Sequence, residues 1–127
     1  MSELTCLELS VLLWVVHVLV QAGASQTALP LLWLLSARDK PVPPGGLFYG
    51  RATRALANYV ENFTAFAALD LAFIATHQSG GWGPTIWIVA RILYLPLYLF
   101  NVIYVRSAVW GLSLLAILIM LARLAWS

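Results

Sequence analysis

A polar stripe interrupts an apolar chain in the segment GRATRALANYVENF, residues 50–63. The segment places Arg51, Arg54, Asn58 and Glu61 at intervals of three, four and three residues. At about 100° per residue, these four side chains lie on one face of a helix. A helix that is otherwise hydrophobic needs a specific reason to carry such a face.

The whole chain has the composition of a membrane protein. Of its 127 residues, 62% are hydrophobic and 9% are charged, whereas an ordinary soluble domain has roughly 25% charged residues. The formal net charge of +2 comes from few groups. No basic cluster is interleaved with exposed aromatic residues, so nucleic-acid binding is excluded. Cys6 is the sole cysteine, which excludes an intrachain disulfide and a cysteine-rich metal site.

Four apolar stretches are long enough to cross the ~30 Å hydrocarbon core, which takes about 20 helical residues. We expect the chain to turn near Arg106, because one helix from Ile86 to Trp126 would be about twice as long as that core. The stretches lack the apolar and polar alternation of β-barrel strands. The sequence therefore predicts an all-α integral membrane protein. The expected four-transmembrane-helix bundle forms one domain, residues 1–127, with helices at about 4–35, 47–77, 84–105 and 107–126.

The one hydrophilic connection is SARDKPVPPGG, residues 36–46, whose three prolines and two glycines prevent a continuing helix. It carries Arg38 and Lys40, and two arginines of the stripe follow it. Positive charge near the ends of spans marks the cytoplasmic side. We therefore expect this loop and the Arg106 turn inside, and both termini outside. The tryptophans near expected helix ends are typical of an interfacial aromatic belt; they are Trp82, Trp87, Trp110 and Trp126.

The third expected helix carries a second polar stripe with the same spacing. Its members are Arg91, Tyr94, Tyr98 and Asn101. An ionisable group in hydrocarbon costs several kcal/mol unless it is paired or hydrated, so both stripes should face a partly aqueous pocket. Alternatively, Arg51 and Arg54 extend to the headgroups. This alternative suits Glu61 and Arg91 poorly, because they lie deeper.

Asp70 lies about 180° around the second helix from Glu61. Polar groups on opposite faces are easier to cover when another subunit supplies part of the wall, so we expect an oligomer. Arg91 has two candidate partners. Asp70 and Arg91 lie equally far from the turn HQSGGWGP, which suggests equal depth in an antiparallel hairpin. Glu61 would need the two helices to be offset. We expect a structural role for Asp70 and Arg91, behind the pocket.

A pocket with these side chains suits a small zwitterionic peptide. Guanidinium groups bind carboxylates, and Asn and Glu bind amide and ammonium groups. Glutathione has all of these groups, although the residues do not separate it from another low-molecular-weight thiol. A cation beside the thiol would lower the thiol pKa and raise the thiolate fraction. Arg106, followed by Ser107 at the start of the fourth expected helix, is the best-placed cation.

Two segments resemble the MAPEG family, the membrane-associated proteins of eicosanoid and glutathione metabolism. The first, RATRALANYVEN, is similar to the Arg-rich, Asn-x-x-Glu segment on the family's second helix. The second is ARILYLPLYLFNVIYVRSAVW, in which an Arg, two Tyr and an Arg-Ser pair recur. The resemblance spans nearly the whole chain, and Pro96 with the LPLY phrase is similar to a bacterial branch. Asn62 departs from the family pattern, because certain synthases have an aromatic residue there.

The resemblance implies a homotrimer in a bacterial inner membrane, with glutathione bound between neighbouring subunits near the cytoplasmic side. It implies that Arg106 is the catalytic residue that stabilises the thiolate. The other residues assigned to glutathione are Arg38, Arg51, Arg54, Asn58, Glu61, Tyr94, Tyr98 and Ser107. The implied reaction conjugates glutathione to a lipophilic electrophile from the bilayer, or reduces such a molecule with glutathione, and uses no metal.

Two other classes of function are alternatives to a transferase. The MAPEG family also contains the five-lipoxygenase-activating protein, so this chain can instead be a non-catalytic membrane protein that binds lipid and presents it to a partner. Such a carrier would lose Arg106 with little effect. A transporter or channel subunit would need a polar path through the whole bilayer, and the stripes cluster toward one side. The sequence has no Ser/His/Asp triad, Gly-rich phosphate loop or HExxH motif, which argues against a hydrolase, kinase or protease.

Overall fold

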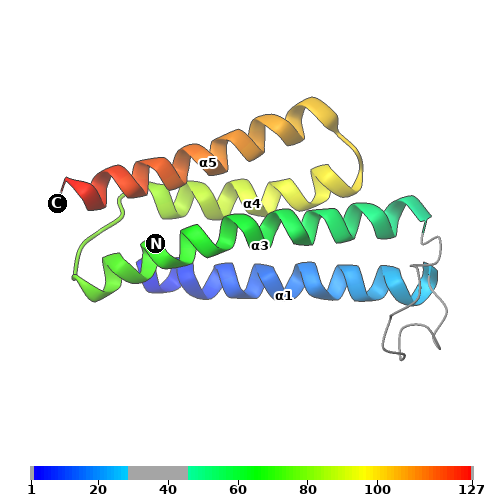
Figure 1. Cartoon of the computed structure of the whole chain (residues 1–127), viewed down its shortest axis with the longest axis horizontal. Helices are drawn as coiled ribbons and strands as arrows, with labels where there is room; N and C mark the ends of the chain where they lie inside the picture. Colours follow the sequence, from blue (N-terminus) through cyan, green and yellow to red (C-terminus); the bar gives the residue numbers. More distant parts are fainter. Residues whose placement is uncertain (1, 29–45, 127) are drawn as a thin grey trace.

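The computed structural model describes residues 2–28 and 46–126. Within these ranges the chain forms four α-helices that lie side by side as a bundle (Figure 1). They are α1 (Glu3–Ala28), α3 (Gly46–Ala75), α4 (Gly83–Leu99) and α5 (Ile103–Ala125). The predicted all-α, four-helix architecture is confirmed. Arg38, residues 29–35 of the first expected helix and the expected loop up to residue 45 lie outside the described residues.

The turn between α4 and α5 comes earlier than predicted. The chain reverses at residues 100–102, whereas Arg106 already lies in the first turn of α5. Asn101 adopts a left-handed backbone with φ of 58°. The N–H of Asn101 donates to the Tyr98 carbonyl at 3.1 Å, and the next N–H donates to the Leu97 carbonyl at 2.9 Å. This Schellman pattern ends α4, and Asn tolerates the required conformation better than most residues.

The end of α3 has the same kind of cap. His77 has φ of 55°, and its N–H donates to the Ile74 carbonyl at 3.2 Å. The N–H of Gln78 donates to the Phe73 carbonyl at 2.9 Å. From this cap the chain runs back along α3 before α4 begins (Figure 1). The helix α3 therefore extends past the start of α4, and the two helices do not form a symmetric hairpin.

Aromatic residues fill the core between α3 and α4. The Trp87 ring stacks on the Phe66 ring with centroids 4.0 Å apart, and its Nε1–H donates to Asn62 Oδ1 at 3.3 Å. Because Trp87 is fully buried, its predicted place in an interfacial belt is wrong. The same contact explains Asn62, because an apolar or aromatic residue there would leave the indole N–H of Trp87 without this acceptor.

Two of the described helices are long and apolar enough to cross a membrane, namely Glu3–Ala24 of α1 and Ile103–Ala125 of α5. The helix α4 is apolar but shorter, with 17 residues. The helix α3 carries Arg51 and Glu61, the charged residues at the two ends of its polar stripe, and it also carries Asp70. Large apolar side chains such as Leu19 and Leu121 are exposed on the outside of the bundle. That surface is suited to contact with lipid or with another subunit rather than with water.

Candidate functional site

A polar pocket lies beside α3, α4 and the first two turns of α5. Its volume is about 240 Å³. The residues that line it are Asn58, Tyr94, Tyr98, Arg106, Ser107 and Trp110. We call it the tyrosine pocket. Both polar stripes and the Arg-Ser pair contribute to it, although the residues come from three separate parts of the chain.

Tyr98 contacts two cations, Arg106 of the pocket lining and Arg54 of α3, which is not among the lining residues. The Nε–H of Arg54 donates to Tyr98 Oη at 3.1 Å. The Cζ of Arg106 lies 4.6 Å from the centroid of the Tyr98 ring. The Tyr94 ring is next to it, with a centroid separation of 5.6 Å and an interplanar angle of 43°. One guanidinium group from α3 and one from α5 therefore contact the same phenol, and this positive charge beside the pocket favours an anionic ligand.

Arg91 supports the wall of the pocket from inside the bundle. It is 0% exposed, and its Nη1–H donates to Asn58 Oδ1 at 2.9 Å. Its Cζ lies 4.3 Å from the centroid of the Tyr94 ring. Its Nε and Nη2 atoms are buried without a hydrogen-bond partner among the described residues. Arg91 thus contacts two residues that line the pocket, Asn58 and Tyr94, and its structural role stays a prediction.

Neither predicted carboxylate partner of Arg91 is correct. Both carboxylate oxygens of Asp70 are buried and have no hydrogen-bond partner among the described residues, and Glu61 is exposed. The expected pairing assumed that α3 and α4 meet at equal depth. Instead, the contact between Trp87 and Asn62 sets a register in which Arg91 faces Asn58.

Arg51 and Arg54 perform different tasks although they lie one turn apart. Arg51 Nη1–H donates to the Leu99 carbonyl at 3.2 Å. Leu99 ends α4, where carbonyl groups lack helical partners and the helix dipole is negative, so Arg51 ties α3 to α4. The Arg54 guanidinium instead lies over Gly50, with Nη1 3.1 Å from the position that a Cβ atom would occupy. Only Arg54 is held at the edge of the tyrosine pocket.

The model of the MAPEG family matches residues 5–126, nearly the whole chain. The chain belongs to the MAPEG family. The predicted resemblance is thereby confirmed, and with it the assignment to an all-helical family of membrane proteins. Neither the curated proteins nor the solved structures include a match to this chain. In this MAPEG protein, both segments that carry the resemblance supply side chains to the tyrosine pocket.

Some predicted site residues of this MAPEG protein lie apart from the pocket. Glu61 does not line it, and the Glu61 carboxylate makes no hydrogen bond with any residue that the structure describes. Ser107 does line the pocket, but its Oγ–H donates to the Ile103 carbonyl at 3.1 Å, so its hydroxyl donor is already used. Arg38 lies outside the described residues.

Two aromatic residues of the site were not predicted from the sequence. Trp110 was assigned to the interface, yet it lines the tyrosine pocket. Its spacing of four residues from Arg106 places it on the same face of α5 and was the available signal. Tyr59 lies behind Arg91, with its ring centroid 5.4 Å from the Arg91 Cζ, and stacks on His17 at 4.4 Å. No spacing along the sequence indicates that contact, because His17 comes from α1.

Proposed function

We propose that the tyrosine pocket binds glutathione and that this MAPEG protein is a membrane-bound, glutathione transferase-like enzyme. The observation that carries the proposal is the placement of Arg54 and Arg106 on the same side chain, Tyr98. Two cations beside one pocket suit a peptide with two carboxylates and a thiol that must ionise. Membership in the family supports an activity of this general kind.

The hydrogen bonds within the site leave the appropriate donors for glutathione. Arg54 uses its Nε–H on Tyr98, and its two terminal nitrogens make no hydrogen bond with a residue that the structure describes, so they can bind a carboxylate. Asn58 accepts from Arg91 through Oδ1, and a guanidinium can only donate. The amide nitrogen of Asn58 is therefore oriented as a donor, suited to a carboxylate or a peptide carbonyl of the ligand.

Arg106 is the proposed catalytic residue. Its charge stabilises the thiolate of bound glutathione and lowers the thiol pKa, and the thiol proton leaves to water through the open side of the pocket. The sulfur then donates an electron pair to an electrophilic carbon of a lipophilic molecule from the bilayer. A C–S bond forms while the leaving group departs with its own electron pair. Tyr98 keeps the Arg106 guanidinium near the pocket through the cation–π contact.

We further propose that the protein forms a homotrimer, in which a neighbouring subunit completes the glutathione site. A volume of about 240 Å³ is small, since ligand pockets usually span ~300–1,000 Å³. Glu61 is exposed next to the pocket-forming face of α3 and has no partner in its own described chain. A second subunit across this face would enlarge the site and give Glu61 a ligand ammonium group or a basic residue to contact. The gathering of Arg51, Arg54 and Arg106 at one end supports a multi-pass chain with that end in the cytoplasm.

The ultraviolet absorbance of the thiolate tests the proposal. Glutathione is added to the detergent-purified protein, and the difference spectrum is recorded for the wild type, Arg106→Ala and Arg106→Lys. We expect a thiolate signal in the wild type, its loss in Arg106→Ala and partial recovery in Arg106→Lys, which retains the charge without the planar fork. Equal signals in the wild type and Arg106→Ala would remove Arg106 from the mechanism. Lipid binding without any glutathione binding would favour the carrier function instead.

A further inference from the structure

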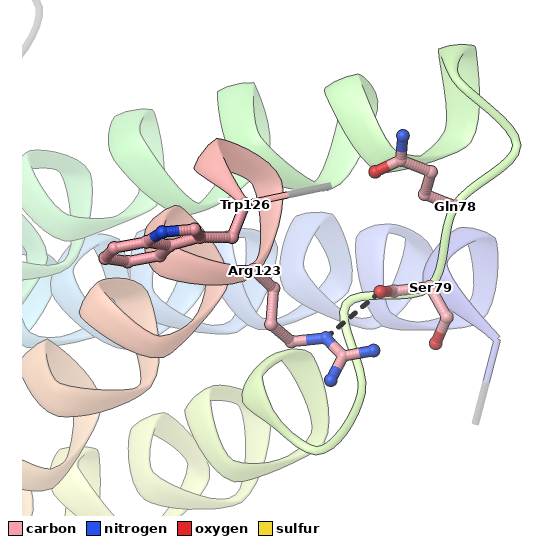
Figure 2. Close-up of a pocket in the computed structure, with 4 residues that line it drawn as sticks. All are labelled: Gln78, Ser79, Arg123 and Trp126. Carbon is pink, nitrogen blue, oxygen red and sulfur yellow. Dashed lines mark hydrogen bonds between the residues drawn. The ribbon is translucent and has the colours of Figure 1, made fainter.

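A second pocket lies at the opposite end of the bundle from the tyrosine pocket. Its volume is about 460 Å³, within the ~300–1,000 Å³ range of small-molecule sites. It is lined by Gln78 and Ser79 of the turn between α3 and α4, and by Arg123 and Trp126 at the end of α5 (Figure 2). Neither polar stripe reaches this pocket, so the proposed transferase chemistry does not account for it.

The Arg123 guanidinium is fixed beside the turn. Its Nε–H donates to the Ser79 carbonyl at 3.3 Å (Figure 2). Its Cζ lies 3.0 Å from the position that a Cβ atom of Gly81 would occupy. Gly81 has φ of 68°, so glycine provides both the left-handed backbone and the space for the cation. The two terminal nitrogens of Arg123 make no hydrogen bond with a described residue, so they can bind a ligand.

The acidic residue near this turn is bonded to the backbone of the turn and not to the cation. Glu3 Oε1 accepts the Gly80 N–H at 2.8 Å and the Ser79 hydroxyl at 3.4 Å. The Gly81 N–H donates to Ser79 Oγ at 3.1 Å. These bonds hold the turn against α1 and leave Arg123 without a carboxylate partner among the described residues. Within residues 2–28 and 46–126, an external anion can therefore bind the guanidinium without displacing an ion pair.

Two further groups add to the chemistry of this pocket. The Oε1 atom of Gln78 is buried and has no hydrogen-bond partner among the described residues. A buried amide oxygen without a donor is uncommon, and a bound hydroxyl group would supply the donor. Trp126 is 86% exposed beside Arg123. Tryptophan at the end of a membrane helix favours the level of the lipid headgroups.

We propose that this pocket binds the phosphate headgroup of an anionic glycerophospholipid. Arg123 binds the phosphate oxygens through its terminal N–H groups. Gln78 Oε1 accepts a hydrogen bond from a headgroup hydroxyl, which a glycerol headgroup has and a choline headgroup lacks. Trp126 packs beside the glycerol and acyl boundary. The bound lipid would join α5 to the turn between α3 and α4, at the end of the bundle that carries both described termini (Figure 1).

Native mass spectrometry of the intact protein, equilibrated with equal amounts of phosphatidylglycerol and phosphatidylcholine, tests this inference. We expect the wild type to retain phosphatidylglycerol preferentially. Arg123→Gln should lower that retention roughly fivefold, the effect of one basic residue at a lipid surface. Arg51→Gln is the matched control, because it removes the same charge at the opposite end of the bundle, and it should change the retention less than about twofold. Circular dichroism verifies that each variant is folded.

A second variant separates position from charge. Gly81→Ala keeps every charge but places a methyl group where the Arg123 guanidinium lies, so it should also lower phosphatidylglycerol retention. Equal retention in the wild type and Arg123→Gln would overturn the inference, and so would an equal loss in Arg51→Gln. A third arm adds inorganic phosphate alone. If phosphate occupies the pocket while phosphatidylglycerol is not retained, the site binds a free anion and the lipid assignment is wrong.

Discussion

The Nε–H of Arg54 on α3 donates a 3.1 Å hydrogen bond to the phenol oxygen of Tyr98 on α4. The same Tyr98 ring lies beneath the Arg106 guanidinium of α5. One side chain therefore positions the two cations that we assign to glutathione. Removal of its hydroxyl group should affect only one of them.

Tyr98→Phe should weaken glutathione binding by about tenfold, equivalent to ~1.4 kcal/mol, because Arg54 loses the acceptor that orients it. The ring remains, so Arg106 keeps its cation–π contact and the thiolate absorbance per bound glutathione should not change. Tyr104→Phe is the control, since Tyr104 is 88% exposed and lies outside the pocket. Equal dissociation constants for Tyr98→Phe and the wild type in equilibrium dialysis would disprove the role of this hydrogen bond.

Gly50→Ala should weaken glutathione binding without a loss of stability. A Cβ atom at residue 50 would lie 3.1 Å from Arg54 Nη1, which is the flexible end of a side chain and can move away. The thermal unfolding midpoint should stay equal or rise slightly, because alanine is the better helix former. Calorimetric titration with glutathione provides the affinity. Unchanged affinity would mean that the observed Arg54 conformation is not required for binding.

Substitutions of Asn58 should separate stability from binding. Asn58→Leu leaves the buried Arg91 Nη1 without its acceptor and should destabilise the protein by about 1–3 kcal/mol. Asn58→Asp keeps an acceptor for Arg91, so it should be more stable than Asn58→Leu, yet its negative charge should repel a glutathione carboxylate. Thermal unfolding and glutathione dialysis measure the two effects. Equal glutathione affinity in Asn58→Asp and the wild type would show that Asn58 does not face a carboxylate of the ligand.

Gly83→Ala should destabilise the contact between α4 and α5. A Cβ atom at residue 83 would lie 2.6 Å from Met120 Cγ and 3.2 Å from the Ala116 carbonyl oxygen. Such overpacking typically costs about 1–3 kcal/mol. Gly111→Ala, also at a glycine in the bundle, has no neighbouring atom within 4 Å and should be neutral or stabilising. Thermal unfolding in one detergent compares them, and equal midpoints for the two variants would refute the packing argument.

The site was predictable from the sequence where it depends on local helical geometry. The stripe that contains Asn58 defines one face of α3, and the stripe that contains Tyr94 and Tyr98 defines one face of α4. These two faces meet in the pocket. The Arg106–Ser107 pair was also assigned to the pocket, although the turn before it was placed too late. The periodicity of a helix relates residues a few positions apart. The predicted face of a helix therefore stays correct when its predicted ends are wrong.

The pairing of helices was less predictable because it depends on the connections. The left-handed cap at His77 lets α3 run past the start of α4, and no residue type in the turn HQSGGWGP signals how far. This offset moved Arg91 away from Asp70 and toward Asn58. Trp87 was misassigned for a related reason, since a tryptophan near a helix end is equally compatible with the interface and with the core until the packing partner is known.

The central claim is that the tyrosine pocket binds glutathione, and equilibrium dialysis of radiolabelled glutathione against the purified protein tests it most directly. We predict saturable binding to the wild type and to Tyr104→Phe, and an affinity at least about tenfold lower in Arg54→Gln, which removes a charged donor. Binding that does not saturate, or equal affinity in the wild type and Arg54→Gln, would contradict the claim.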